Sequence, residues 1–125
     1  MADENPPNLS EILIDRGYAY YQQKRYRHAK NDYEAAKRLL ETRSNGNDDS
    51  KEQLILTARL IYLYGARGMY EEATGECVKL IEMCELLGEK YDGYLSTALK
   101  KKKEFADLDF TQEVQIDEDS AKLAK

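Results

Sequence analysis

One stretch decides the fold of this chain: Gly17-Tyr18-Ala19-Tyr20-Tyr21-Gln22-Gln23-Lys24-Arg25-Tyr26-Arg27-His28-Ala29. Small and aromatic residues alternate there at helical spacing on both sides of a short polar break, which predicts two helices joined by a tight turn. The pattern returns 44 residues later without a gap, since Tyr18, Tyr20, Tyr26, Ala29 and Glu41 are followed at that distance by Tyr62, Tyr64, Tyr70, Ala73 and Glu85. Repetition on this scale is typical of helical-repeat proteins, which usually work by binding.

The composition favours a single helix-rich domain. The chain has 125 residues, 34% of them charged, a net charge of −5 and only two prolines, both within the first seven residues. An acidic balance argues against nucleic acid as the partner. The sequence contains neither a signal-peptide pattern nor an apolar run of the roughly 20 residues that a membrane span requires. We therefore expect a protein of the cytoplasm or nucleus without a membrane partner.

The first hairpin is expected over residues 9–41, after a polar lead at 1–8. Asn8 and Glu11 form a capping-box pattern at its start. The first helix carries two apolar lines at helical spacing, whereas the second helix carries one. The two lines are Leu13, Gly17, Tyr20 and Ile14, Tyr18, Tyr21; the single line is Tyr26, Ala29, Tyr33, Ala36, Leu40. The first helix should therefore have two packing surfaces.

The second hairpin is expected over residues 51–87, after a turn-rich loop. Its first helix repeats the two lines, with Leu54, Thr57, Ile61, Tyr64 on one and Ile55, Ala58, Tyr62 on the other. Its second helix should end at Gly88, which suits a helix C-cap. A capping helix at 90–106 would complete a domain spanning 9–107. The acidic segment 108–125 has no sustained period and is expected to be a mostly disordered tail.

Residues for catalysis are lacking. The only histidine, His28, lies in a charged turn, and the sequence shows neither a cysteine-histidine metal spacing nor a glycine-rich phosphate loop. Cys77 and Cys84 lie seven residues apart on one predicted helix, about 10 Å, which is too far for a disulfide. We expect reduced core thiols, no metal, no cofactor and no enzymatic activity.

The spacing of Leu13, Gly17, Tyr20, Tyr26, Ala29 and Ala36 resembles the tetratricopeptide-repeat pattern, in which small residues stand where paired helices touch. The long period and the ending Glu85-Leu86-Leu87-Gly88 are similar to the repeats of kinesin light chains and Leu-Gly-Asn-type polarity adaptors, over about residues 9–105. This resemblance implies an all-α fold, a right-handed stack of antiparallel helix hairpins with about five helices. The second copy departs from the pattern at Thr57 and Ile61, so a looser helix crossing is expected there.

The resemblance also implies a concave wall formed by the first helix of each pair. At the wall positions this chain has Ile14, Tyr18, Tyr21, Gln22, Ile55, Ala58, Tyr62, Ala66 and, in the capping helix, Leu95 and Leu99. Ile14 and Tyr18 stand where a clamp for chaperone tails would need Lys and Asn, so that ligand is not expected. The expected function is a non-enzymatic adaptor or chaperone-like scaffold that holds a peptide or helix segment of another protein in this apolar, tyrosine-rich groove.

Two alternatives stay open beside this interpretation. The same face could join two copies of the chain as a homodimer. A basic set could meet RNA or another acidic polymer, although a solvated turn and a lysine-rich helix end explain it more simply. That set is Lys24, Arg25, Arg27, Lys100, Lys101, Lys102. Phe110, Val114 and Ile116 of the tail could also dock in the groove.

Overall fold

The computed structural model describes residues 8–42 and 50–123, with side chains described as far as Leu108. Within these residues the chain is all-α, as expected. The elements are α1 (Leu9–Gln22), α2 (Tyr26–Thr42), α3 (Ser50–Ala66), α4 (Tyr70–Leu87), the 3-10 turn η1 (Glu89–Tyr91) and α5 (Asp92–Leu123). Most of the expected lead and of the inter-hairpin loop, at 1–7 and 43–49, lies outside the described residues. Of the helices described, none combines the length and apolar character needed to span a membrane.

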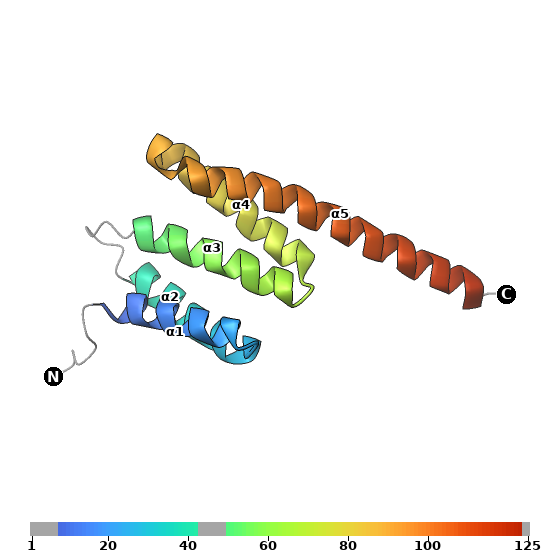
Figure 1. Cartoon of the computed structure of the whole chain (residues 1–125), viewed down its shortest axis with the longest axis horizontal. Helices are drawn as coiled ribbons and strands as arrows, with labels where there is room; N and C mark the ends of the chain where they lie inside the picture. The colour runs from blue at the N-terminus through green and yellow to red at the C-terminus, as the bar shows by residue number, and fades with distance from the viewer. Residues whose placement is uncertain (1–7, 43–49, 124–125) are drawn as a thin grey trace.

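The helices are arranged in two layers. α1 packs on α2 and α3 packs on α4 as two hairpins, and α5 runs along α4. α3 lies between α1 and α5 and touches both (Figure 1). No Cα atom of α2 lies within 8 Å of one in α4. We call the side formed by α1, α3 and α5 the groove face, and the opposite side the α2–α4 face.

The two hairpins turn in the same way. Lys24 has φ +65°, and Gly68, 44 residues later, has φ +74°. In each turn the next residue, Arg25 or Met69, donates its backbone N–H at 2.9 Å to the carbonyl oxygen five residues earlier. This is the hydrogen bond of a Schellman helix end, whose left-handed residue is most often glycine. The 44-residue echo in the sequence is therefore also an echo in backbone geometry.

The core consists of two clusters that share α3. Tyr33, only 1% exposed, is the largest buried side chain of the first. The first cluster is Ile14, Ala29, Tyr33, Ala36, Leu40, Leu56, Leu60, Leu63; the second is Leu54, Ile61, Ala73, Cys77, Leu80, Cys84, Ala98, Phe105. Because α3 contributes to both, burial of its two sides stabilises the contact between the hairpins.

Gly17 allows α1 to cross directly over α2. A Cβ atom at Gly17 would lie 2.6 Å from Cε1 of Tyr33, which no real side chain could tolerate without a shift. Beside this crossing, Arg16 donates two hydrogen bonds, of 2.8 and 2.7 Å, to the buried carboxylate of Asp32. The paired geometry satisfies a carboxylate that would otherwise be buried at a large cost.

The start of α1 differs from the expectation in one detail. Asn8 precedes the helix, but its side chain makes no capping hydrogen bond, so the predicted capping box is not formed. Instead the fully buried hydroxyl of Ser10 donates to Glu52 of α3. The first turn of α1 is thus held by the second hairpin.

The last helix is longer than predicted. α5 continues to Leu123, into the 108–125 segment that the sequence assigned to a disordered tail, and its distal part extends past both hairpins (Figure 1). Neither glycine nor proline follows Gly93 in the sequence. Nothing in the chain therefore forces the helix to end near residue 106.

Candidate functional site

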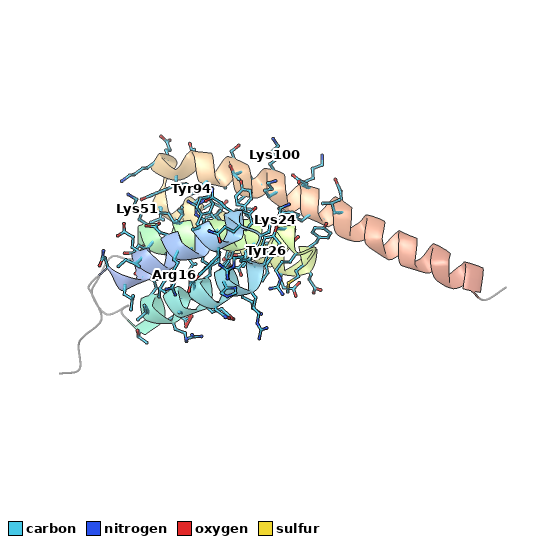
Figure 2. All side chains as sticks on the ribbon, turned by 60° about the horizontal axis from the view of Figure 1, so that its bottom comes forward. Arg16, Lys24, Tyr26, Lys51, Tyr94 and Lys100 are labelled. Atoms are coloured by element: carbon cyan, nitrogen blue, oxygen red, sulfur yellow. The ribbon has the colours of Figure 1, made fainter. Side chains whose placement is uncertain are left out.

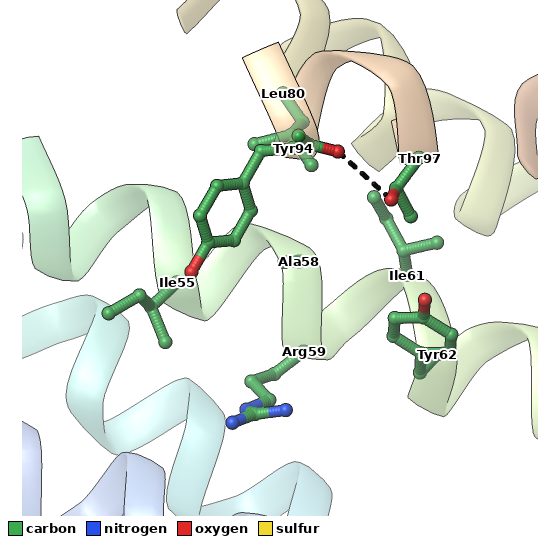
Figure 3. Close-up of a pocket in the computed structure, with 9 residues that line it drawn as sticks. Ile55, Ala58, Arg59, Ile61, Tyr62, Leu80, Tyr94 and Thr97 are labelled. Carbon is green, nitrogen blue, oxygen red and sulfur yellow. Dashed lines mark hydrogen bonds between the residues drawn. The ribbon is translucent and has the colours of Figure 1, made fainter. Parts of the chain in front are cut away.

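A cavity of about 330 Å³ opens between α3 and the start of α5, and we call it the α3–α5 cavity. The rings of Tyr62 and Tyr94, 37% and 38% exposed, border it (Figure 3). The lining is Ile55, Ala58, Arg59, Ile61, Tyr62, Leu80, Gly93, Tyr94, Thr97. Helical spacing aligns the α3 residues, because positions three and four apart face the same way. The result is a mostly apolar hollow with aromatic walls.

A second hollow, of about 360 Å³, lies between α1 and α3. Its lining is Glu11, Ile14, Asp15, Lys51, Glu52, Ile55. Since Ile55 belongs to both hollows, they adjoin along the groove face. Three carboxylates and one cation line the α1–α3 hollow. Among the residues that the structure describes, the α3–α5 cavity has no carboxylate in its lining, and its one charged residue is Arg59.

Tyrosines extend the aromatic surface from α3 to α1. The rings of Tyr18 and Tyr21 stack with their centroids 6.1 Å apart, and Tyr26 lies 5.9 Å from Tyr21. The pKa of Tyr21 is raised, chiefly by burial and further by the nearby phenols of Tyr26, Tyr18 and Tyr62. The sequence placed Tyr18, Tyr21 and Tyr62 on one wall, and the structure brings them close together.

Arg59 is a site residue that the sequence pattern did not single out. Its guanidinium carbon lies 3.8 Å from the centroid of the Tyr18 ring. Its Nε atom is buried and has no hydrogen-bond acceptor. Arg59 stands four residues after Ile55 and three before Tyr62, and this spacing is the signal that could have placed it on the wall.

The other predicted wall residues differ in exposure. Ile14 contributes to the lining of the α1–α3 hollow, but it is only 4% exposed and belongs to the first core cluster, so it offers a partner little surface. The reason is that α3 packs over it, since Leu56 and Leu60 share its cluster. Half-buried are Tyr18, Tyr21, Ile55, Ala58; exposed are Gln22, Tyr62.

The predicted basic residues form two separate groups, one around the α1–α2 turn and one on α5. Lys24, Arg25 and Arg27 are exposed around the first turn, and Lys100 and Lys102 are exposed on α5 (Figure 2 labels Lys24 and Lys100).

Lys101 is half-buried and differs from its neighbours on α5. Its Nζ atom lies 5.4 Å from the centroid of Tyr62 and 3.4 Å from Oε2 of Glu104. This lysine therefore borders the groove face and does not project into solvent with Lys100 and Lys102.

The two thiols are buried, and the described side chains form no cluster that could bind a metal ion. Cys77 and Cys84 are buried, and burial raises the pKa of Cys77 to about 11, so little reactive thiolate is present near neutral pH. Among the described side chains, in residues 8–42 and 50–108, no three His, Cys, Asp or Glu gather in a way that could hold a metal ion.

No protein-family model, no characterised protein and no solved structure matches this chain. The geometry of the groove face is therefore the basis for a functional proposal.

Proposed function

We propose that this chain is a non-enzymatic protein-interaction module of the helical-repeat kind, which holds a peptide or helix segment of a partner protein on its groove face. The α3–α5 cavity is the observation that carries the proposal. Its volume of about 330 Å³ lies at the lower end of the range for ligand sites. A site of this size suits one bulky side chain of a partner.

The chemistry of the walls supports a protein ligand. Tyrosine offers a large contact area, a polar tip and few rotatable bonds, and it is enriched among residues that dominate binding energy. Tyr62 and Tyr94 face the cavity from two different helices (Figure 3). The neighbouring rings of Tyr18 and Tyr21 would lengthen the contact beyond a single side chain.

The α2–α4 face suits a partner less well. Its groove, of about 170 Å³, is bordered by the charged side chains Lys37, Glu41, Glu76 and Lys79. Lys79 already pairs with Glu76 at 3.1 Å. A partner would have to desolvate these charges to reach the floor of the groove, which offsets the gain from apolar contact.

Site-specific photo-cross-linking tests the proposal. A photoreactive phenylalanine derivative replaces Tyr62 in one protein and Val78 in another, since both side chains are 37% exposed and Val78 lies on α4 outside the cavity lining. In cell extract we expect a discrete adduct from position 62 and none from position 78. Equal adducts, or none at position 62, would contradict the proposal. An adduct near twice the 14.4 kDa chain mass would instead support the homodimer.

A further inference from the structure

Arg59 specifies the chemistry of the partner. We infer that the groove face selects peptides that place an acidic side chain on the Arg59 guanidinium and a neighbouring apolar side chain in the α3–α5 cavity. This inference rests on the proposed function of that face and names the class of its ligand.

The first argument is the lack of an acceptor at Arg59. Its Nε atom is buried without a hydrogen-bond partner, and its guanidinium lies over the Tyr18 ring at 3.8 Å. A cation–π contact lies on the face of the guanidinium and accepts no hydrogen bond in its plane. Arg59 as a residue is half-buried and lines the cavity, so a carboxylate placed beside it would pair with the guanidinium charge through short, charge-assisted hydrogen bonds.

The surrounding residues do not supply that carboxylate. Burial is the main effect on the pKa of Tyr33 and raises it, while the nearby charge of Arg59 acts in the opposite direction. The Tyr33 hydroxyl is also buried without a hydrogen-bond partner. Asp32, the acid adjacent to Tyr33, is engaged by Arg16 through bonds of 2.8 and 2.7 Å. Within the part of the chain that the structure describes, no carboxylate therefore pairs with Arg59.

The second argument is the position of Arg59 beside the apolar hollow. It lines the same cavity as Ile55 and Tyr62, one helical turn from each. In Figure 3 its side chain extends away from Tyr94 and toward the first hairpin. An acidic and an apolar residue close together in a peptide could therefore reach the guanidinium and the cavity at once.

The charged residues along the groove face indicate where the acidic side chain of the peptide binds. Lys101, the cation near Tyr62, is paired with Glu104. The adjoining α1–α3 hollow carries Glu11 and Asp15, which would repel a second acid placed there. The acidic residue of the peptide is therefore expected at Arg59 and not toward the start of α1.

Selection from a random peptide library displayed on phage tests the inference. The peptides are fused to the coat protein through their C-termini, so that any acid selected is a side chain and not a terminal carboxylate. Wild-type protein should enrich Asp and Glu at least about threefold over the starting library. Arg59→Met and Arg59→Gln should abolish this enrichment, and Arg59→Glu should enrich Lys and Arg instead.

Matched variants separate the inference from the proposed function. Tyr62→Ala should lose the apolar preference while the acidic one persists in the weaker binders. Arg67→Met, a change at an exposed arginine beyond the end of α3, should leave selection unchanged. Circular dichroism checks that every variant is folded, and Arg59→Gln covers the case in which Arg59→Met is not.

The outcomes differ in what they overturn. Two results would overturn the inference and leave the proposed function standing. In the first, the binders require Tyr62 but show no preference for acidic residues. In the second, the acidic preference persists with both Arg59→Met and Arg59→Gln. Binders indifferent to Tyr62→Ala combined with Tyr94→Ala, or no binders at all, overturn both. For a selected peptide, changing its acid to the amide should weaken binding to wild type about tenfold and binding to Arg59→Met by less than about twofold.

Discussion

The two hairpins differ in the residues that lie where their helices cross. In the first, Gly17 lies against Tyr33, whereas Ile61 and Cys77 occupy the positions 44 residues later, buried in one cluster. In the first hairpin the small residue lies on the first helix and the large one on the second. In the second hairpin the larger residue lies on the first helix and the smaller one on the second. The two copies therefore share backbone geometry and pair a large residue with a small one, while the helix that carries the large residue changes.

A second difference lies on the groove face. Tyr21 of the first hairpin corresponds to Gly65 of the second, where a Cβ atom would lie 2.5 Å from Cζ of Phe105. Glycine lets Phe105 of α5 approach and stack on Tyr70, with centroids 5.8 Å apart. α5 thus covers the end of the second hairpin, and at the same position the first hairpin keeps an aromatic ring.

The largest predicted effect comes from exchanging the crossing pair. Gly17→Ile should overpack the helices and lower the free energy of unfolding by about 3 kcal/mol. Tyr33→Cys should leave a cavity at a similar cost of about 3–4 kcal/mol. The double variant restores one large and one small residue, so its loss should be smaller than the sum by at least about 1 kcal/mol. Urea unfolding followed by circular dichroism measures all three.

Gly75→Ala is the control for this cycle, because a Cβ atom there meets no atom within 4 Å and the residue lies inside α4. Alanine at that position should stabilise the protein by about 0.5–1 kcal/mol. Losses from Gly17→Ile and Tyr33→Cys that simply add would contradict the exchange of volume between the hairpins.

An alkaline pH series probes Cys77, which stands 44 residues after Tyr33 in the second hairpin. Burial is the main cause that raises the pKa of Cys77 from an ordinary 9.0 to about 11. The unfolded thiol loses its proton near pH 9 and the folded one near pH 11, so the contribution of Cys77 to stability is complete below pH 9 and is lost between those values. Cys77→Val should remove on the order of 1–2 kcal/mol of this loss.

Urea unfolding at intervals from pH 8 to 11 provides the measurement for Cys77. The difference between wild type and Cys77→Val isolates the thiol from the tyrosines, which ionise in the same range. Parallel pH curves for the two proteins would show that the thiol is not protected by folding.

The smallest effect concerns the two turns. Lys24 holds the left-handed conformation that Gly68 holds without a Cβ atom. Lys24→Gly should therefore raise the free energy of unfolding by about 1 kcal/mol, and Gly68→Lys should lower it by about as much. Thermal unfolding gives both signs. Changes of the same sign would mean that the turns are not equivalent.

Much of the fold followed from spacing alone. The 44-residue period located both turns, the line through Tyr33, Ala36 and Leu40 identified buried residues, and Gly88 marked the end of α4. These features depend on contacts within one hairpin, which helical periodicity describes directly.

The candidate site was harder to predict, because it depends on how separate helices approach one another. Ile14 is buried only because α3 covers it. Tyr94 lines the cavity from α5, which follows the 3-10 turn η1, and helical periodicity does not encode how α5 approaches α3. An arginine on a helix is usually solvated, so the sequence gives no reason to single out Arg59. Only the structure shows its guanidinium against the Tyr18 ring.

Binding of a partner on the groove face can be observed residue by residue. Amide chemical shifts of the ¹⁵N-labelled protein, recorded while a library-selected peptide is added, test it most directly. We predict that Ala58, Tyr62 and Thr97 shift in a saturable manner, while Lys37 and Met83 on the α2–α4 face do not. Shifts centred on Lys37 and Met83, with the groove face unchanged, would contradict the account.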